Sequence, residues 1–424
     1  MVRMNRIVQV LLLGGLVVLQ GCMFTTLRNE LREMKHTRVL TGRVLDQVQP
    51  EANVVLVLYR QTPDGLKIVH GTLLDSAVGK FVVEVPTGTF YLFAFEDLDN
   101  DLAWDGTEPS GYYGMPDAVV VTDSSPATLG GFDIRLNASA PPPGVFPETV
   151  SLPVEALGSS IVRAGQIADL DDPIFSLDYG NMGYWRPLTF IREVGFSLFF
   201  REPFDPGKIP VLFVHGALGT PHGWKDIVDR LDPDRFQPWF YYYPSGLPLD
   251  KNAAALNWMV AKLHREFGFR KLHVVAHSMG GLVARDFILK NAYESRLDVV
   301  RQFISISSPW NGHRLTAKGV RRAPAVVPSW HDMVPDSPFI RSLFARRLPE
   351  FVTYDLLFSY RGDCRFFLEN NDGTVEISSQ LDMRAQREAR RIYGYDEDHG
   401  SILTSAETLA QIARLLSAPA GSPH

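Results

Sequence analysis

Two regions of the chain differ in the pattern of their hydrophobic positions. Between about residues 37 and 137, short apolar runs are separated by turn residues and show no helical periodicity. Regularly spaced short runs of this kind predict an antiparallel β-sandwich. From about residue 205 to 418, strand-like runs are instead followed by helix-like stretches or glycine-bearing loops. The strands expected in the first region span residues 38–44, 54–59, 81–85, 90–95, 119–121 and 132–136.

A turn that contains a serine joins one strand-like run of the second region to a helix. Residues 272–275 predict a buried strand, a helix-like stretch begins at Gly281, and the motif Ala-His-Ser-Met-Gly occupies positions 276–280 between them. Small residues two positions before and after a serine allow a tight turn that lifts the hydroxyl off the sheet. Ser278 is therefore the expected nucleophile.

A nucleophilic serine needs a histidine base and a carboxylate that orients this base. The turn-rich segment 370–375 places Asp372 after a strand-like run, and His399 follows another strand-like run at residues 391–395. We expect Asp372 to be the orienting carboxylate and His399 to be the base.

Other histidines and acids fit these roles less well. His273 and His277 are so close to the serine in sequence that they cannot easily reach its hydroxyl, and we expect them to pack or to form hydrogen bonds. Asp298 and Asp363 are less suitable than Asp372. Asp372 lies in a turn, and it stands between the serine and the histidine in the chain order Ser278, Asp372, His399.

Donors for a developing oxyanion are expected from two backbone amides. The strand-like run 209–214 leads into the glycine-bearing loop 215–219, which can present the N–H of Ala217. The N–H of Met279 lies at a helix N-terminus, where unpaired amides favour negative charge. His215 at the start of the loop is expected to be structural.

The chain order Ser278, Asp372, His399 resembles that of α/β-hydrolases of the lipase and esterase type. The resemblance covers about residues 205–418 and implies the α/β fold class: an α/β-hydrolase domain with a doubly wound, mostly parallel sheet, preceded by a small all-β sandwich domain. We assign residues 151–418 to the hydrolase domain. The resemblance also implies a cap or lid around residues 310–347 and a catalytic machinery that requires no cofactor.

The cap region contains one apolar stripe that permits two interpretations. Phe339, Ile340, Leu343 and Phe344 have the spacing of one face of a helix. The stripe fits an amphipathic lid helix, which would favour acyl or lipid substrates, and it fits a cap helix that is packed permanently on the core.

The beginning of the chain predicts export. Two arginines precede the apolar stretch at residues 7–19, which is too short to span a bilayer and is typical of a signal peptide, here residues 1–21. Leu-Gln-Gly-Cys at positions 19–22 resembles the lipobox of bacterial lipoproteins. This implies a lipid-modified Cys22 and a tether at residues 22–36. The alternative is cleavage elsewhere, which would leave Cys22 an ordinary cysteine.

The lipoprotein resemblance also implies a location. Met23 is not the aspartate that retains such proteins at the inner membrane, so we expect a lipid-anchored protein of the cell envelope, at the outer membrane of a Gram-negative bacterium. Cys364 is the second of two cysteines, and it has no disulfide partner in the chain if Cys22 is lipidated. The net charge of −6 provides no reason to expect a nucleic-acid partner.

The sandwich region resembles prealbumin-like modules and contains an acidic loop at residues 97–108. Its acidic residues occupy positions that bind calcium in an EF-hand loop, but Leu102 stands where that loop requires glycine, and the preceding segment is strand-like instead of helical. A structural calcium site and a solvated acidic turn both remain open. The proline-rich segment 138–150 is the expected linker to the next domain. The acidic residues are Asp97, Asp99, Asp101, Asp105 and Glu108.

These features predict a membrane-anchored serine hydrolase that cleaves carboxylic esters through an acyl-enzyme on Ser278. Lipase, phospholipase and carboxylesterase activities all fit, with an acyl ester or lipid as substrate. Two alternatives remain: an acyltransferase that uses the same triad, and a non-catalytic envelope binding protein built on a hydrolase scaffold.

Overall fold

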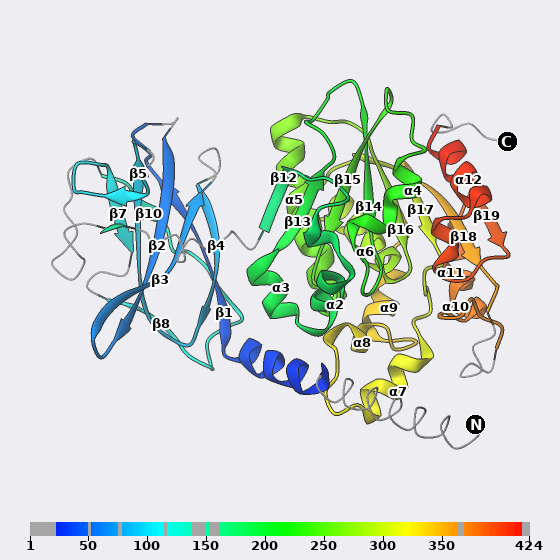
Figure 1. Ribbon diagram of the computed structural model, residues 1–424, viewed down its shortest axis with the longest axis horizontal. Helices are drawn as coiled ribbons and strands as arrows, with labels where there is room; N and C mark the ends of the chain where they lie inside the picture. Colours follow the sequence, from blue (N-terminus) through cyan, green and yellow to red (C-terminus); the bar gives the residue numbers. More distant parts are fainter. Residues whose placement is uncertain are drawn as a thin grey trace, which may run out of the picture. The chain divides into compact units, whose positions relative to one another are not determined.

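The computed structural model describes residues 23–49, 52–74, 79–99, 101–113, 117–137, 150–151, 162–362 and 369–417 (Figure 1). The expected signal peptide, Cys22, Cys364 and almost all of the expected linker lie outside these residues. The chain forms two compact units, one mainly before residue 162 and one mainly after it. Within the described ranges, no helix is both long enough and apolar enough to cross a membrane.

The first unit is a β-sandwich made of two main sheets (Figure 1). One sheet has the order β10-β1-β4, with β9 also paired to β1, and the other has the order β3-β2-β5-β7, with β8 also paired to β5. A short third pair joins β6 to β11. The strands are β1 Thr37–Leu45, β2 Asn53–Thr62, β3 Gly65–Leu74, β4 Lys80–Pro86, β5 Gly88–Asp97, β6 Ala103–Trp104, β7 Ser110–Tyr113, β8 Val119–Val121, β9 Thr128–Leu129, β10 Ile134–Arg135 and β11 Val150–Ser151.

The sandwich differs from the sequence prediction in several respects, which include the short strands β6, β7 and β9 that were not predicted. Strand β3 was missed, because glycines at its start and middle interrupt the apolar run. Strands β9 and β10 pair with β1 in parallel, since the chain has crossed from the other sheet before it reaches them. Strand β11, which lies where the expected linker ends and the expected hydrolase domain begins, pairs with β6 of the sandwich.

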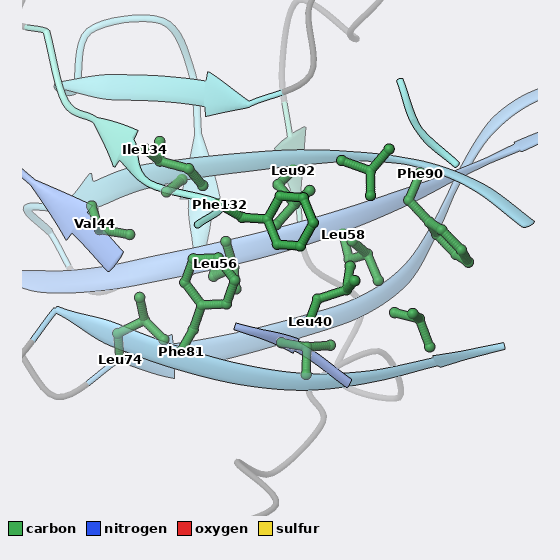
Figure 2. Packing of buried hydrophobic residues seen from close by; sticks show 14 of the residues in the cluster. Leu40, Val44, Leu56, Leu58, Leu74, Phe81, Phe90, Leu92, Phe132 and Ile134 are labelled. Carbon is green, nitrogen blue, oxygen red and sulfur yellow. The ribbon is translucent and has the colours of Figure 1, made fainter. Parts of the chain in front are cut away.

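Alternating side chains of the central strand β2 build two hydrophobic clusters. Leu56 and Leu58 pack between the sheets with Leu40 of β1 and Phe81 of β4 (Figure 2). Val55, Val57 and Tyr59, which alternate with these leucines along β2, point to the opposite face and join a second cluster with Trp104. Strand β2 is therefore buried on both faces, which explains its nearly continuous apolar sequence.

The second unit contains an eight-stranded sheet of order β12-β13-β15-β14-β16-β17-β18-β19. Strand β13 is antiparallel to β15, and the pairs from β15 onward to β19 are parallel. The expected mostly parallel sheet is therefore confirmed. Its strands are β12 Val162–Ile167, β13 Phe196–Phe200, β14 Ile209–Val214, β15 Phe236–Tyr242, β16 Leu272–His277, β17 Val300–Ile306, β18 Thr353–Ser359 and β19 Arg391–Tyr395.

All seven residues of β15 and five of the six residues of β14 are buried. Because side chains of a strand alternate between the two faces, both faces of this sheet must be covered, and helices cover them. Helix α5 packs against α6, and α4 contacts α12. The helices are η2 Pro173–Phe175, α2 Leu177–Trp185, α3 Pro187–Glu193, η3 Pro221–Trp224, α4 Lys225–Val228, α5 Leu249–Phe267, α6 Met279–Tyr293, α7 Arg314–Arg322, α8 Pro328–Asp332, α9 Pro338–Leu343, α10 Ile377–Gln380, α11 Met383–Gln386, η4 Ser401–Leu403 and α12 Ala406–Ser417.

The apolar stripe of the cap region belongs to α9 and is held against the core. Ile340 and Leu343 are 0% and 1% exposed, and the buried Arg285 of α6 donates a hydrogen bond to the carbonyl of Leu343 at 2.9 Å. The guanidinium of Arg285 also lies 4.4 Å from the ring centre of Phe344. These contacts favour a permanently packed cap helix over a mobile lid.

Candidate functional site

Ser278 occupies a strained turn between β16 and α6. Its backbone has φ 54° and ψ −133°, a conformation that costs energy for a residue other than glycine and raises the side chain above the end of the sheet. The loop that follows β14 approaches it closely, since a Cβ added to Gly216 would lie 2.8 Å from Cβ of Ser278. The serine turn and the glycine-bearing loop therefore form one surface.

Three side chains that are far apart in the sequence form a continuous hydrogen-bonded chain at this surface. Nε2 of His399 lies 2.8 Å from Oγ of Ser278, and Nδ1 of His399 lies 2.7 Å from Oδ2 of Asp372. The N–H of His399 also donates to the carbonyl of Asp372 at 2.9 Å. The structure thus brings together the expected nucleophile, base and orienting carboxylate.

Asp372 is fully buried and accepts hydrogen bonds from several donors. Oδ2 accepts from Ser359 and Gln380 in addition to His399, and Oδ1 accepts from the amides of residues 374 and 375. Burial alone would raise the pKa of this carboxyl, but the hydrogen bonds and the neighbouring His399 outweigh burial and lower the pKa below its usual value. Asp372 is therefore held ionised beside the histidine.

The two expected oxyanion donors lie beside Ser278 in one pocket wall. Met279 is the first residue of α6, so its amide has no acceptor within the helix. Ala217 follows Gly216, whose added Cβ would be 3.3 Å from Oγ of Ser278. The amide of Ser278 itself donates to the carbonyl of Ile306 at 2.8 Å and is already used.

The neighbouring histidines have structural contacts. Nε2 of His277 lies 2.8 Å from the carbonyl oxygen of His399, and burial together with His399 lowers the pKa of His277 to about 3. His215 stacks on Tyr243 with ring centres 4.3 Å apart, and burial lowers its pKa to about 4. Both rings therefore stay neutral near pH 7, and His277 supports the backbone of His399.

A pocket of about 680 Å³ opens at Ser278 and His399. Most of its exposed lining is apolar, so it suits a hydrocarbon group better than a charged one. The apolar lining residues come from the glycine-bearing loop, the cap and the segments near Asp372 and His399. They include Leu218, Trp224, Met279, Pro309, Leu315, Trp330, Met333, Val375 and Leu403.

Some pocket residues were not found by sequence reasoning. Tyr184 of α2 and Trp330 of α8 line the pocket, and the sequence carries no motif around either of them, although Trp330 lies in the expected cap region. His313 caps α7 by accepting a hydrogen bond at Nδ1 from the amide of Leu315. In the sequence, the position of His313 directly before a helix-like segment could have indicated this capping role, since side chains that accept hydrogen bonds favour such positions.

The acidic loop of the sandwich brings together three of its five candidate residues. Carboxylate oxygens of Asp97, Asp99 and Glu108 all lie within 4.8 Å of one another. Asp101 and Asp105 instead accept hydrogen bonds from amides two residues further on, at 2.7 and 2.9 Å. The expected five-residue set is therefore reduced to three in the structure.

Replacement of Gly280 by alanine should disrupt the serine turn. The added Cβ would lie 2.3 Å from the carbonyl oxygen of His215 and 2.4 Å from that of Val214, and neither backbone atom can move without shifting β14. We expect a loss of roughly 1–3 kcal/mol of stability or more, together with a displaced Ser278. Thermal denaturation measures this effect. Gly223→Ala is the control, because its Cβ meets no atom within 4 Å; equal melting of both variants would contradict the prediction.

Comparison with known proteins gives one family match and a set of similar structures. Residues 248–325, which include Ser278, match the model of a family described as an alpha/beta hydrolase of unknown function (DUF915). No curated protein sequence matches the chain.

The similar structures include two lipases and the product of the Listeria innocua gene lin2722. The mature lipase BlEst2 of Bacillus licheniformis is 21% identical over 52% of this chain and 97% of its own, with a TM-score of 0.41. The Listeria protein is 16% identical over 50% of this chain and 94% of its own, with a TM-score of 0.39. Lipase B of Aspergillus fumigatus is 19% identical over 53% of this chain and 56% of its own, with a TM-score of 0.40.

The family match and the architecture agree. The matched segment runs from the region of α5 through the serine turn to the cap, and it lies within the mostly parallel eight-stranded sheet and its covering helices. Ser278, Asp372 and His399 follow strands of this one sheet in the order that the sequence motifs predicted. The second unit of this protein therefore has the α/β-hydrolase fold, and residues 248–325 within it match an α/β-hydrolase family model.

Proposed function

We propose that the protein is a serine hydrolase that cleaves carboxylic esters with long or medium acyl groups, as a lipase, phospholipase or carboxylesterase does. The observation that carries this proposal is the hydrogen-bonded chain from Ser278 through His399 to Asp372, at 2.8 and 2.7 Å, on the floor of an apolar pocket. A serine activated in this way attacks acyl carbon atoms.

The reaction proceeds in two halves. Oγ of Ser278 attacks the ester carbonyl while Nε2 of His399 accepts its proton, and the ionised Asp372 stabilises the resulting imidazolium. The negative charge on the carbonyl oxygen is held by the amides of Ala217 and Met279. His399 then protonates the departing alcohol and leaves the acyl group on Ser278. Water activated by His399 cleaves this acyl-enzyme and releases the carboxylic acid.

The pocket supports an acyl group as the part of the substrate that is bound. Its walls present mostly apolar surface from Leu315, Trp330 and Met333 of the cap region, opposite the glycine-bearing loop. A hydrocarbon chain gains about 0.8 kcal/mol for each methylene removed from water. We therefore expect the efficiency of hydrolysis to rise with acyl length until the pocket is filled.

Chromogenic esters of graded acyl length test the proposed function. We expect kcat/KM to increase from acetate toward longer acyl chains and then to level off, and we expect a fluorescent phosphonate to label Ser278. Mass spectrometry locates the labelled peptide. Absence of both hydrolysis and labelling would refute the proposed enzymatic function. The alternative of a non-catalytic binding protein would then remain. Preferential transfer of the acyl group to an added alcohol in water would indicate an acyltransferase.

The proposal extends to a lipid anchor at Cys22. Residues 23–35, expected as a tether, form a helix in which Leu27 is fully buried. Phe24, two positions after Cys22, contacts Trp185 edge to face with ring centres 5.5 Å apart, and Trp185 contacts Trp330 of the pocket wall at 6.2 Å. These contacts connect the start of this helix to the pocket wall, and they support a substrate drawn from the membrane.

Replacement of Cys22 by alanine should release the protein from the membrane, because stable anchoring requires the acyl chains that this residue would carry. In a Gram-negative host, we expect the wild type to sediment with the outer membrane and to enter the detergent phase, and we expect Cys22→Ala to do neither. Mass spectrometry of the N-terminal peptide measures the modification directly. Cys364→Ala should behave as the wild type; an equal membrane fraction for both variants would refute the anchor.

A further inference from the structure

The acidic loop between β5 and β7 concentrates negative charge at one end of the sandwich. Asp97 is the last residue of β5 and is 1% exposed, Glu108 is 9% exposed, and Asp99 lies at the surface. One carboxylate oxygen from each of the three lies within 4.8 Å of the others. Two oxygens on opposite sides of a calcium ion with bonds of about 2.4 Å are separated by about 4.8 Å. The spacing therefore fits one ion.

Glu108 is the residue whose position requires explanation. Its Oε1 accepts a hydrogen bond from the amide of Leu98 at 2.7 Å, but its buried Oε2 has no hydrogen-bond partner among the described residues. A buried carboxylate oxygen without a donor is costly. Its closest charged neighbours are also carboxylates, so nothing in the described part of the loop compensates its charge.

The loop backbone has the turn that an EF-hand loop needs at its sixth position. Leu102 has φ 59°, in the left-handed region where glycine is normally found, so the leucine does not prevent the turn. The amides of Asp101 and Leu102 both point to the carboxylate of Asp97, at 3.1 and 3.3 Å. The strained turn thus wraps the chain around the first acidic residue.

The second half of the loop is fixed to the hydrophobic core. Trp104 packs edge to face on Phe93 with ring centres 5.2 Å apart, and its indole N–H donates to the carbonyl of Glu108 at 3.0 Å. Val150 belongs to the same buried cluster and pairs with Trp104. The backbone at Glu108 is therefore held close to the core by Trp104.

We propose that this loop binds one calcium ion through the carboxylates of Asp97, Asp99 and Glu108. Calcium takes six to eight oxygen ligands in flexible geometry, so backbone carbonyls and water complete the shell. Magnesium requires shorter bonds and a near-ideal octahedron, which an irregular loop anchored at both ends does not offer. The ion supplies the missing partner of Oε2 and stabilises the β5–β7 connection.

The electrostatics of the loop agree with this assignment. The buried carboxylate of Glu108 lies among the carboxylates of Asp97 and Asp99, so like charges repel one another when no cation is present. A divalent cation between the carboxylates reverses this repulsion. Binding therefore depends on the number of negative ligands, and removing one of them weakens it.

Calorimetric titration of the full-length protein with calcium chloride, after removal of metals by chelator, tests the site. We expect one ion per chain and slower hydrogen exchange in peptides that cover residues 97–108. Asp99→Asn should weaken calcium binding by at least about tenfold, because ligand charge sets the affinity of such loops. Asp99 is exposed, so this variant is expected to fold.

Asp105→Asn removes the same charge from the same loop outside the three-carboxylate cluster, and we expect its calcium affinity to stay within about twofold of the wild type. Glu108→Gln should lose binding as Asp99→Asn does, and Ser278→Ala should bind calcium normally because its site is elsewhere. No binding or added protection up to about 10 mM calcium would overturn the proposal. Equal protection by magnesium would overturn the assignment of the ion, as would equal affinity in Asp99→Asn and Asp105→Asn.

Discussion

Replacement of Ser278 by alanine is expected to reduce ester hydrolysis by about 10⁴- to 10⁶-fold, because the variant lacks the hydroxyl that is paired with His399 and forms the acyl-enzyme. His399 lies 2.8 Å from the serine oxygen and would have no nucleophile to activate. The measurement is kcat/KM with the best chromogenic ester. The melting temperature should change little, since the variant removes one oxygen atom from a cavity wall and leaves the backbone turn in place.

Ser378→Ala is the matched control for this experiment. Ser378 is an exposed serine of α10 that donates a hydrogen bond to Glu369 and does not line the pocket. We expect its activity to equal that of the wild type. Retention of most of the activity in Ser278→Ala would contradict the assignment of the nucleophile. Loss of activity in both variants would point instead to a general disturbance of the domain.

Replacement of Asp372 by asparagine is expected to lower kcat by roughly 10³- to 10⁴-fold. All the groups around this carboxylate are hydrogen-bond donors, so the amide nitrogen of asparagine would face at least one donor. If the amide faces His399, the ring must accept at Nδ1 and carry its proton on Nε2. In that tautomer it cannot take the proton of Ser278. Single-turnover kinetics would place the loss in the acylation step.

Asp298→Asn is the control for the carboxylate. The side chain of Asp298 is 77% exposed and contacts Arg301 at the surface, so its replacement should leave kcat within about twofold of the wild type. A similar rate for Asp372→Asn would show that the histidine is oriented without this carboxylate. Thermal denaturation must accompany the rates, because Asp372 is buried and its hydrogen bonds also contribute to stability.

The sequence predicted the parts of the site that depend on short segments. The tight turn around Ser278 needs small neighbours, and Gly280 contacts backbone so closely that a Cβ could not fit. Asp372 and His399 follow strand-like runs and occupy turn-prone segments, so their places at the end of the sheet could be read locally. The predicted strands at 54–59 and 119–121 likewise rest on local patterns, which β2 and β8 reproduce.

Other features could not be predicted because they depend on contacts between distant segments. Strand β3 was missed since its glycines hide the pattern, and β9 and β10 pair in parallel with β1 only after the chain has crossed between sheets. The apolar stripe of α9 fitted both a mobile lid and a packed cap. The contact of Arg285 with Leu343 decided for the packed cap, and no local pattern indicates that an arginine will be buried there.

The sequence by itself determined which residue types occur in which local conformations: a serine in a tight turn, an acid and a histidine after strands, and an acidic loop in a β-rich region. The tertiary structure decided which of these residues meet. It joined Ser278, His399 and Asp372 in one hydrogen-bonded chain, and it selected Asp97, Asp99 and Glu108 from five acidic residues. The physical reason is that hydrogen bonds and ion binding depend on distances of a few ångströms, and packing between distant segments sets those distances.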